Sequence, residues 1–348
     1  MPWTMIEREP EIDVTYGAGE NGTRVLSYAD SIREALIQAM TLDERVFLMG
    51  QGINDKSGMF GTTTDLYKKF GEDRAFDTPL AETGLTGVAI GAAMGGLRPV
   101  YFHNRPDFLM LSMDQLVNHA SKYNYMSGGE CPVPLVIFAV TGQGWGSAAQ
   151  HSQALQGLFM HVPGLKIVMP TTPYDAKGLM LQAIADNNPV LFLDHRKLYN
   201  QKGYVPEKMY TVPLGKGTIR REGKDITLLG ISSMFPEAWK AAEELESKGI
   251  MAEVIDLRTV KPFDLELILK SVTKTGRLVI ADTGWKTAGI AAEIAASVYE
   301  NAFGSLKAAV ERVALPDLPT PAAYTLEDAF YRTKEDIVKA AMKALGRE

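Results

Sequence analysis

One carboxylate stands in front of a long segment of small and apolar residues. Glu82 precedes residues 84–97, which are almost wholly Gly, Ala, Leu, Ile, Val and Thr. A segment that can pack tightly on every side predicts a buried helix or a helix at a subunit contact. Glu82 is then either a first-turn acid favoured by the helix dipole, or an acid held in a pocket of low polarity. In such a pocket it could hydrogen-bond a heterocycle nitrogen or move a proton.

A histidine follows a glycine-rich loop further along the chain. His151 lies in 150-QHSQ-153, shortly after the apolar segment 134-PLVIFAV-140 and the loop 141-TGQGWGS-147. Open α/β sheets bind their ligands at the carboxyl ends of strands. His151 is therefore interpreted either as a structural histidine or as a residue of a functional site.

A third polar group follows the apolar stretch 99–102. His103, Asn104 and Arg105 occur together in 101-YFHNRPDF-108, and they cannot all be buried without partners. Either they lie on the surface or they line a cleft suited to an anionic substrate.

Apolar strand-like segments alternate with segments of helical period along most of the chain, which predicts α/β domains built on parallel sheets. The alternation pauses over residues 195–224, which are polar and rich in Gly and Pro. The sequence therefore predicts two doubly wound α/β domains. The expected boundaries are an N-terminal arm over 1–24, a first domain over 25–200, a linker over 201–215 and a second domain over 216–348.

The alternation predicts eight strands and eight helices. Strands are predicted at 45–50, 99–102, 134–140, 189–194, 226–232, 252–258, 277–283 and 310–315, and helices at 27–40, 84–97, 111–126, 173–186, 236–248, 264–272, 288–302 and 334–345.

Composition narrows the function classes. The formal net charge is −6 and no basic cluster occurs, so nucleic acid is not an expected partner. A single cysteine, Cys131, excludes an internal disulfide framework and a cysteine-based zinc site. The N-terminus lacks a signal-peptide pattern and no apolar run reaches the length of a membrane span, so a soluble, cytoplasmic protein is expected. Walker A, dinucleotide, H-E-x-x-H and G-x-S-x-G motifs are absent from the sequence.

Several long motifs in order resemble the beta subunit of the first component of 2-oxo acid dehydrogenases of the pyruvate, branched-chain and acetoin types, within the transketolase-like thiamine diphosphate enzymes. The motifs span the chain from about Ser27 to Leu345. They are 77-DTPLAETG-84, 86-TGVAIGAAMGGLRPV-100, 125-YMSGG-129, 150-QHSQ-153, 162-VPGLKIVMPTTPYDAKGL-179, 253-EVIDLRTVKP-262 and 271-SVTKTGRLVIAD-282.

This resemblance implies a role for each matching residue. Glu82 matches the acid that pairs with N1′ of the cofactor's aminopyrimidine and so promotes removal of its C2 proton. Phe108 matches the aromatic residue that packs on the pyrimidine, and His151 a histidine on the substrate side. A structural potassium ion in some relatives is held, largely through backbone oxygens, at positions that match Leu135, Ala183, Asp186 and Asn188. The resemblance also implies a pyrimidine-binding domain followed by a transketolase C-terminal domain.

The resemblance also implies a partner. The G-D-G segment that usually anchors the metal and diphosphate of thiamine diphosphate is absent from this chain. An alpha subunit is therefore expected to hold Mg²⁺ and the diphosphate, most simply in an α₂β₂ heterotetramer, and a lipoyl acyltransferase is a further possible partner.

The chain departs from the family pattern at several positions that bear on the acceptor rather than on the cofactor. They are Gln51, Leu111, Ala139, 103-HNRP-106 and 331-YR-332. His103 and Arg105 are thus candidates for binding the substrate or acceptor. The main expectation is a subunit of an enzyme that decarboxylates a 2-oxo acid and transfers the acyl group. The alternatives are a split transketolase-like carboligase with an aldehyde acceptor, and a beta-like assembly subunit without chemistry.

Overall fold

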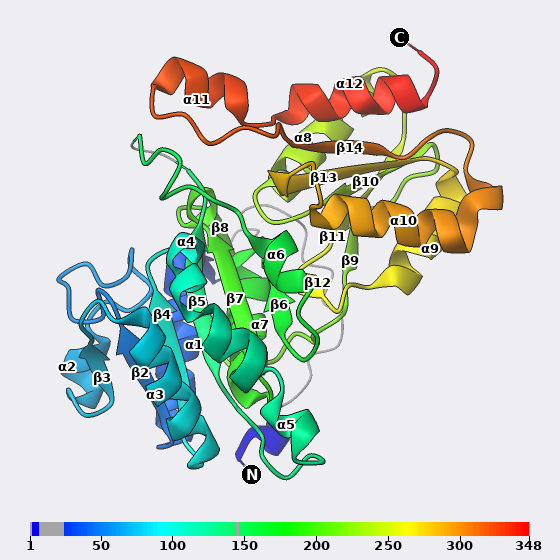
Figure 1. Ribbon diagram of the computed structural model, residues 1–348. Coiled ribbons are helices and arrows are strands. Elements are labelled where there is room, and N and C mark those ends of the chain that lie inside the picture. The colour runs from blue at the N-terminus through cyan, green and yellow to red at the C-terminus, as the bar shows by residue number, and fades with distance from the viewer. Residues whose placement is uncertain (1, 7–23, 144–145, 348) are drawn as a thin grey trace. The chain divides into compact units, whose positions relative to one another are not determined.

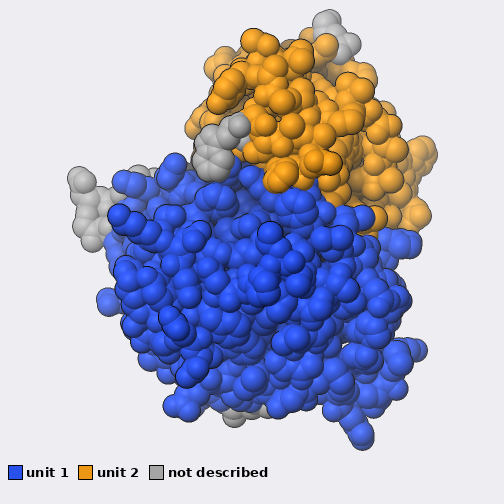
Figure 2. Space-filling view, turned by 60° about the vertical axis from the view of Figure 1, so that its left-hand side comes forward, with its two compact units in different colours: residues 1–141, 159–214 blue, residues 142–158, 215–348 orange. Residues whose placement is uncertain are grey.

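The computed structural model describes residues 2–6, 24–143 and 146–347, which form two compact units. The first unit contains residues 1–141 and 159–214, and the second contains residues 142–158 and 215–348 (Figure 2). Most of the expected N-terminal arm, residues 7–23, lies outside the described residues. Trp3, near the start, donates its indole N–H to Asp43 Oδ2 at 2.8 Å.

The first unit is an α/β unit whose main sheet is parallel (Figure 1). Its strands in this sheet lie in the order β6-β7-β5-β4-β2-β3, and a separate antiparallel pair joins β1 to β8. The strands are β1 Val25–Ser27, β2 Val46–Gly50, β3 Ala75–Asp77, β4 Arg98–His103, β5 Val136–Thr141, β6 Lys166–Val168, β7 Val190–His195 and β8 Lys202–Tyr204. The longer helices are α1 Tyr28–Leu42, α3 Glu82–Met94 and α7 Pro173–Ala185, and the shorter ones are α2 Leu66–Phe70, α4 Pro106–Leu109, α5 Tyr123–Met126 and α6 Gln156–Met160.

The core of this unit lies between one face of the sheet and the helices α1 and α7. Every residue of β4, β5 and β7 is buried, as expected for central strands of a parallel sheet. Phe102, Phe138 and Phe192 follow one another across the three strands, with ring centroids 4.5 and 5.6 Å apart. These rings belong to the same apolar cluster as Ile32 and Leu36 of α1. Helix α3 packs instead with β4 and with the segment that follows α4.

The second unit has a mixed sheet in the order β14-β13-β10-β11-β9, in which only β9 is antiparallel to its neighbour. The strands of this sheet are β9 Thr218–Arg221, β10 Ile226–Gly230, β11 Ala252–Asp256, β13 Leu278–Trp285 and β14 Glu311–Leu315. The unit also contains the short strand β12 Thr259–Lys261, which is not part of this sheet. Its helices are α8 Met234–Ser247, α9 Leu265–Thr275, α10 Ile290–Ala302, α11 Tyr324–Phe330 and α12 Lys334–Ala344.

Two segments differ from the sequence-based expectation. The single helix predicted over 111–126 is divided into a 3₁₀ turn at 110–112, a π turn at 115–120 and α5. Hydroxyl groups compete for local bonds there, since Ser121 donates its Oγ–H to the Val117 carbonyl at 2.8 Å. The segment expected to be a linker, 201–215, packs on the first unit up to Leu214. Lys177, which is fully buried, donates to the carbonyls of residues 206–208.

Among the helices of the described ranges, none is long and apolar enough to cross a membrane.

Candidate functional site

The site begins at a tight bend where β2 ends beside β4. Gly50 has a φ of +139°, and a Cβ at this position would lie 2.2 Å from the Phe102 carbonyl oxygen. Only glycine allows this close approach of two backbones. The bend lets the N–H of Gln51 donate to the same carbonyl at 3.2 Å. The position of Gln51 is therefore set by the backbone of two neighbouring strands.

Glu82 lies at the start of α3 and is 8% exposed. Gln51 Nε2 donates to Glu82 Oε1 at 3.3 Å, and Asn104 Nδ2 donates to Gln51 Oε1 at 2.7 Å. The second bond orients the Gln51 amide, because an oxygen that accepts from Asn104 leaves the NH₂ group to face the carboxylate. The buried acid is thus hydrogen-bonded by a neutral amide, which supports a carboxylate without cancelling its charge.

Tyr101 brings a buried hydroxyl to the same region. Tyr101 is fully buried, and its Oη has no hydrogen-bond partner among the described residues. Burial, together with the negative charge of Glu82, raises the pKa of Tyr101 to about 12, so this phenol stays protonated. A buried O–H donor without a partner is costly unless a ligand accepts its hydrogen bond. Glu82 and Tyr101 thus offer an acceptor and a donor to a bound polar group.

His103 differs from the cationic residue that a substrate anion would need. It is 1% exposed, neither ring nitrogen has a hydrogen-bond partner in the described residues, and the ring lies on Tyr101 with centroids 4.3 Å apart. Burial lowers the pKa of His103 to about 3, so the imidazole is neutral. His103 is therefore a neutral buried ring on Tyr101, and it does not offer positive charge to a substrate anion.

Arg105 lies at the carboxyl end of the sheet near the end of β7. It is buried, and its positive charge acts to lower the pKa values of Asp194, His195 and Arg196. Burial raises the pKa of Asp194 to about 8, although the Arg105 charge opposes the rise. Of the two candidates at 103–106, Arg105 is therefore the one that carries positive charge.

Two hydroxyl bonds tie the segment after Phe108 to the first turns of α3. Thr83 Oγ1 donates to the Leu111 carbonyl at 2.6 Å, and Thr86 Oγ1 donates to Ser112 Oγ at 2.8 Å. Phe108 itself is partly exposed in the short helix α4. The aromatic candidate and the helix that begins with Glu82 are thus held in one local structure.

His151 belongs to the second unit. The segment 142–158 is attached there by Gln156, whose Nε2 donates to Asp282 Oδ1 at 2.8 Å and to Thr283 Oγ1 at 3.2 Å. Burial raises the pKa of Asp282 to about 6. His151 is exposed. Glu82 and Phe108 therefore both belong to the first unit, whereas His151 belongs to the second.

The residues expected to hold potassium meet at the amino ends of β5 and β7. The Leu135 carbonyl accepts from the Val190 N–H at 2.9 Å, and the Asp186 carbonyl accepts from Arg98 Nη1 at 3.0 Å. Asp186 Oδ1 also accepts from the Asn188 N–H at 2.9 Å. Each carbonyl keeps one lone pair for a cation, but the Arg98 guanidinium already supplies positive charge at this place.

Sequence reasoning missed the groups that surround Glu82. Gln51 was noticed as a departure from the family, whereas Asn104 and Tyr101 were not connected with Glu82. The available signal was positional, since Gln51 and Asn104 each follow the end of a predicted strand, and parallel strands end at one edge of a sheet. No cluster of three or more His, Cys, Asp or Glu side chains suited to a metal ion occurs in the described part of the chain.

Comparison with known proteins agrees with this architecture. Residues 24–202 match the transketolase pyrimidine binding domain, and residues 215–337 match the transketolase C-terminal domain. The chain is 45% identical to the acetoin:2,6-dichlorophenolindophenol oxidoreductase subunit beta of Cupriavidus necator, covering 92% of this chain and 98% of that protein. It is 42% identical to the pyruvate dehydrogenase E1 component subunit beta of Bacillus subtilis, again over 92% and 98% of the two chains.

A solved structure shares the fold at lower sequence identity. The inactive beta4 tetramer of a split gene transketolase matches with a TM-score of 0.74 and 24% identity, covering 92% of this chain and 98% of that one. The expected two-domain α/β fold and the family resemblance are confirmed. The chain belongs to the transketolase-like family that includes the E1 beta subunits of 2-oxo acid dehydrogenases.

Proposed function

We propose that this chain is the beta subunit of a thiamine diphosphate-dependent enzyme that decarboxylates a 2-oxo acid, or cleaves a related ketone, and passes the acyl group to an acceptor. The single observation that carries the proposal is the buried carboxylate of Glu82. Gln51, itself held by Asn104, donates to this carboxylate, and the Tyr101 hydroxyl of the same region has no hydrogen-bond partner among the described residues. The family membership of the chain supports it.

The residues at this site fit an aminopyrimidine. Thiamine diphosphate supplies, when bound, the carbon nucleophile that attacks the substrate carbonyl. Glu82 holds a proton shared with the ring nitrogen of the pyrimidine, and its low-polarity surroundings strengthen that hydrogen bond. The Gln51 amide orients the Glu82 carboxylate, and Phe108 would pack against the pyrimidine.

Further side chains and a partner subunit complete the proposed enzyme. His151 acts on the substrate, and Arg105 orients an anionic group. An alpha subunit provides the diphosphate site with its Mg²⁺, because this chain lacks a G-D-G segment. Helix α3 suits a subunit contact, since Val88 and Met94 are 59% and 45% exposed on a helix rich in Gly and Ala.

The test is reconstitution with the separately purified alpha subunit. We expect turnover of pyruvate, 2-oxoisovalerate or acetoin with 2,6-dichlorophenolindophenol as the electron acceptor, and none from either chain alone. Tight magnesium-dependent binding of thiamine diphosphate by this chain alone would contradict the division of the site.

The same assembly tests the carboligase alternative, which the buried charge of Arg105 favours because an acceptor aldehyde often carries an anionic group. Reduction of the dye, or acylation of an added lipoyl domain, identifies the acyl-transferring enzyme. A new carbon–carbon bond with a phosphorylated aldehyde, without dye reduction, identifies the carboligase.

A potassium ion at Leu135, Ala183, Asp186 and Asn188 would brace the amino ends of β5 and β7. Thermal unfolding in KCl and in NaCl at equal ionic strength tests it. We expect a higher Tm in KCl. Equal Tm values would mean that Arg98 holds this segment without an ion.

A further inference from the structure

The sheet of the second unit ends at an edge strand, β14. β14 is the outermost strand and pairs, through Val279↔Glu311 to Trp285↔Leu315, with β13. An edge strand presents backbone N–H and C=O groups that no other strand uses. Pro316 follows β14 directly and lacks an N–H, so this edge offers about five residues of pairing length.

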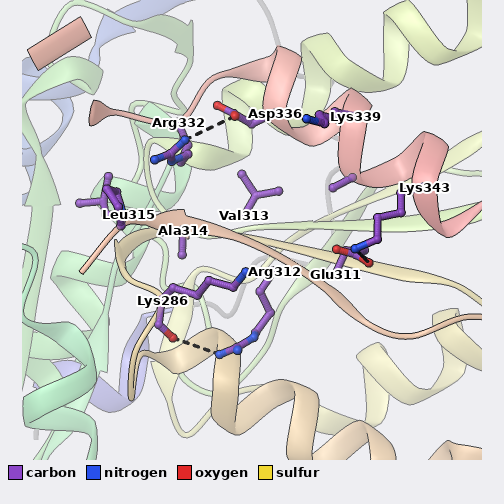
Figure 3. Close-up of a pocket in the computed structure, with 12 residues that line it drawn as sticks. Lys286, Glu311, Arg312, Val313, Ala314, Leu315, Arg332, Asp336, Lys339 and Lys343 are labelled. Carbon is purple, nitrogen blue, oxygen red and sulfur yellow. Dashed lines mark hydrogen bonds and ion pairs between the residues drawn. The ribbon is translucent and has the colours of Figure 1, made fainter. Parts of the chain in front are cut away.

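A cavity of about 370 Å³ lies along β14 and the helix α12. Its floor is made by Val313, Ala314 and Leu315, all buried. Figure 3 shows Lys339 and Lys343 on the α12 side of the strand, and Lys286 and Arg312 on the opposite side. Cationic side chains therefore flank an apolar strip of edge backbone on both sides.

The charges around this groove are unbalanced. Its lining contains five cationic side chains, Lys286, Arg312, Arg332, Lys339 and Lys343, and two acidic ones. The two acids are already engaged, Glu311 with Lys343 at 2.9 Å and Asp336 with Arg332 at 3.6 Å. In the described residues no acid lies within ion-pair distance of Lys286 or Lys339. A positive groove on a chain of net charge −6 indicates an anionic ligand.

The spacing of the cations favours an extended ligand over a compact anion. Arg332 lies just before α12, and from the start of this helix to Lys343 the axial rise is about 14 Å, at about 1.5 Å per residue. A strand of five residues covers about the same length, at about 3.3 Å per residue. Successive side chains of a strand point to opposite sides, which is where the two groups of cations lie.

We propose that this groove binds an extended acidic segment of a partner polypeptide, which adds to the free edge of β14 as a further strand. Backbone hydrogen bonds to β14 would give the register. Successive acidic side chains would reach Lys339 on one side and Lys286 and Arg312 on the other. The proposal concerns the second unit alone and stands whether or not the proposed enzymatic function is correct.

Fluorescence anisotropy with a labelled peptide that carries a run of consecutive Glu residues tests this, because successive side chains then reach both sides of the strand. The protein is the full chain in the assembly in which it is purified. We expect saturable binding, reduced about tenfold or more by Lys286→Gln combined with Lys339→Gln. Lys270→Gln, an exposed cation of the same unit on α9, is the matched control and should leave the affinity unchanged. Circular dichroism of each variant checks the fold.

Two further arms separate strand addition from simple charge attraction. The same peptide with alternate amides N-methylated keeps its charge but cannot pair, so it should bind far more weakly. Equal binding of the methylated peptide, or full displacement by inorganic phosphate at comparable concentration, would overturn the proposal in favour of a free-anion site. No binding of the unmodified peptide to the assembly would overturn it outright.

Discussion

The charged groups at Glu82 and along β14 lie in opposite surroundings, one buried and the other at a partly open surface. Glu82 is a single carboxylate, buried beside neutral amides and a phenol, and its partners are set by the backbone of β2 and β4. The β14 groove instead gathers five cations at a partly open surface. The comparison teaches that the first region depends on short-range geometry and low polarity, whereas the second depends on charges that salt can screen.

Glu82→Gln should produce the largest effect. Glutamine preserves the shape but cannot hold the proton at the pyrimidine nitrogen, so exchange of the cofactor's C2 proton should slow about 10²- to 10³-fold in the assembled complex. The measurement is C2 deuterium exchange followed by NMR. An exchange rate like that of the wild type would reduce Glu82 to a first-turn helix acid.

Gly50→Ala should cost the most folding stability. Its Cβ would meet the Phe102 carbonyl at 2.2 Å with φ at +139°, and strain with overpacking should lower the free energy of unfolding by about 3 kcal/mol. Gly71→Ala is the control, because Gly71 also has a positive φ, +83°, but open space around it. Chemical denaturation should show a clearly smaller loss for the control. Equal losses would mean that the close approach of β2 and β4 is not what places Gln51.

Gln51→Ala should have an intermediate effect on catalysis. Loss of one 3.3 Å hydrogen bond to a carboxylate should slow C2 exchange about five- to tenfold with little change in fold.

Asn104→Ala, which only frees the Gln51 amide to rotate, should have a smaller effect on C2 exchange than Gln51→Ala. Gln51→Glu places two carboxylates side by side, and because each opposes ionisation of the other, the acidic limb of the rate profile should move to higher pH. An unmoved profile would contradict the contact between residues 51 and 82.

A change in ionic strength should have the smallest effect on C2 exchange at the Glu82 site, and a large effect on peptide affinity at the β14 groove. Because Glu82 is buried and its partners are neutral, C2 exchange should change less than about twofold when salt is raised severalfold. Peptide binding at the β14 groove should weaken strongly over the same range. A strong salt dependence of exchange would place a mobile charge near Glu82 that this chain does not supply.

The sequence by itself determined the family and the two α/β units, and it predicted Glu82 as a site residue. Long apolar strands and helical periods are local signals, and the motifs around Glu82 and Phe108 are continuous in the chain. The boundaries of the two units could not be predicted as well from the sequence. Residues 142–158 belong to the second unit because Gln156 bonds Asp282, which is 126 positions away in the chain.

Only the tertiary structure decided how the polar residues after the strands divide their roles. His103, Asn104 and Arg105 are consecutive, and their types alone suggested two cations for a substrate. Pairing of β4 with β2 turns Asn104 toward Gln51, and the face shared with Tyr101 buries His103 as a neutral ring. Of these three residues, Arg105 is the one that carries a positive charge, and this charge lies near Asp194. β4 ends at His103, and Asn104 and Arg105 follow its end. Their surroundings are set by the pairing of the strands and by burial, which composition cannot specify.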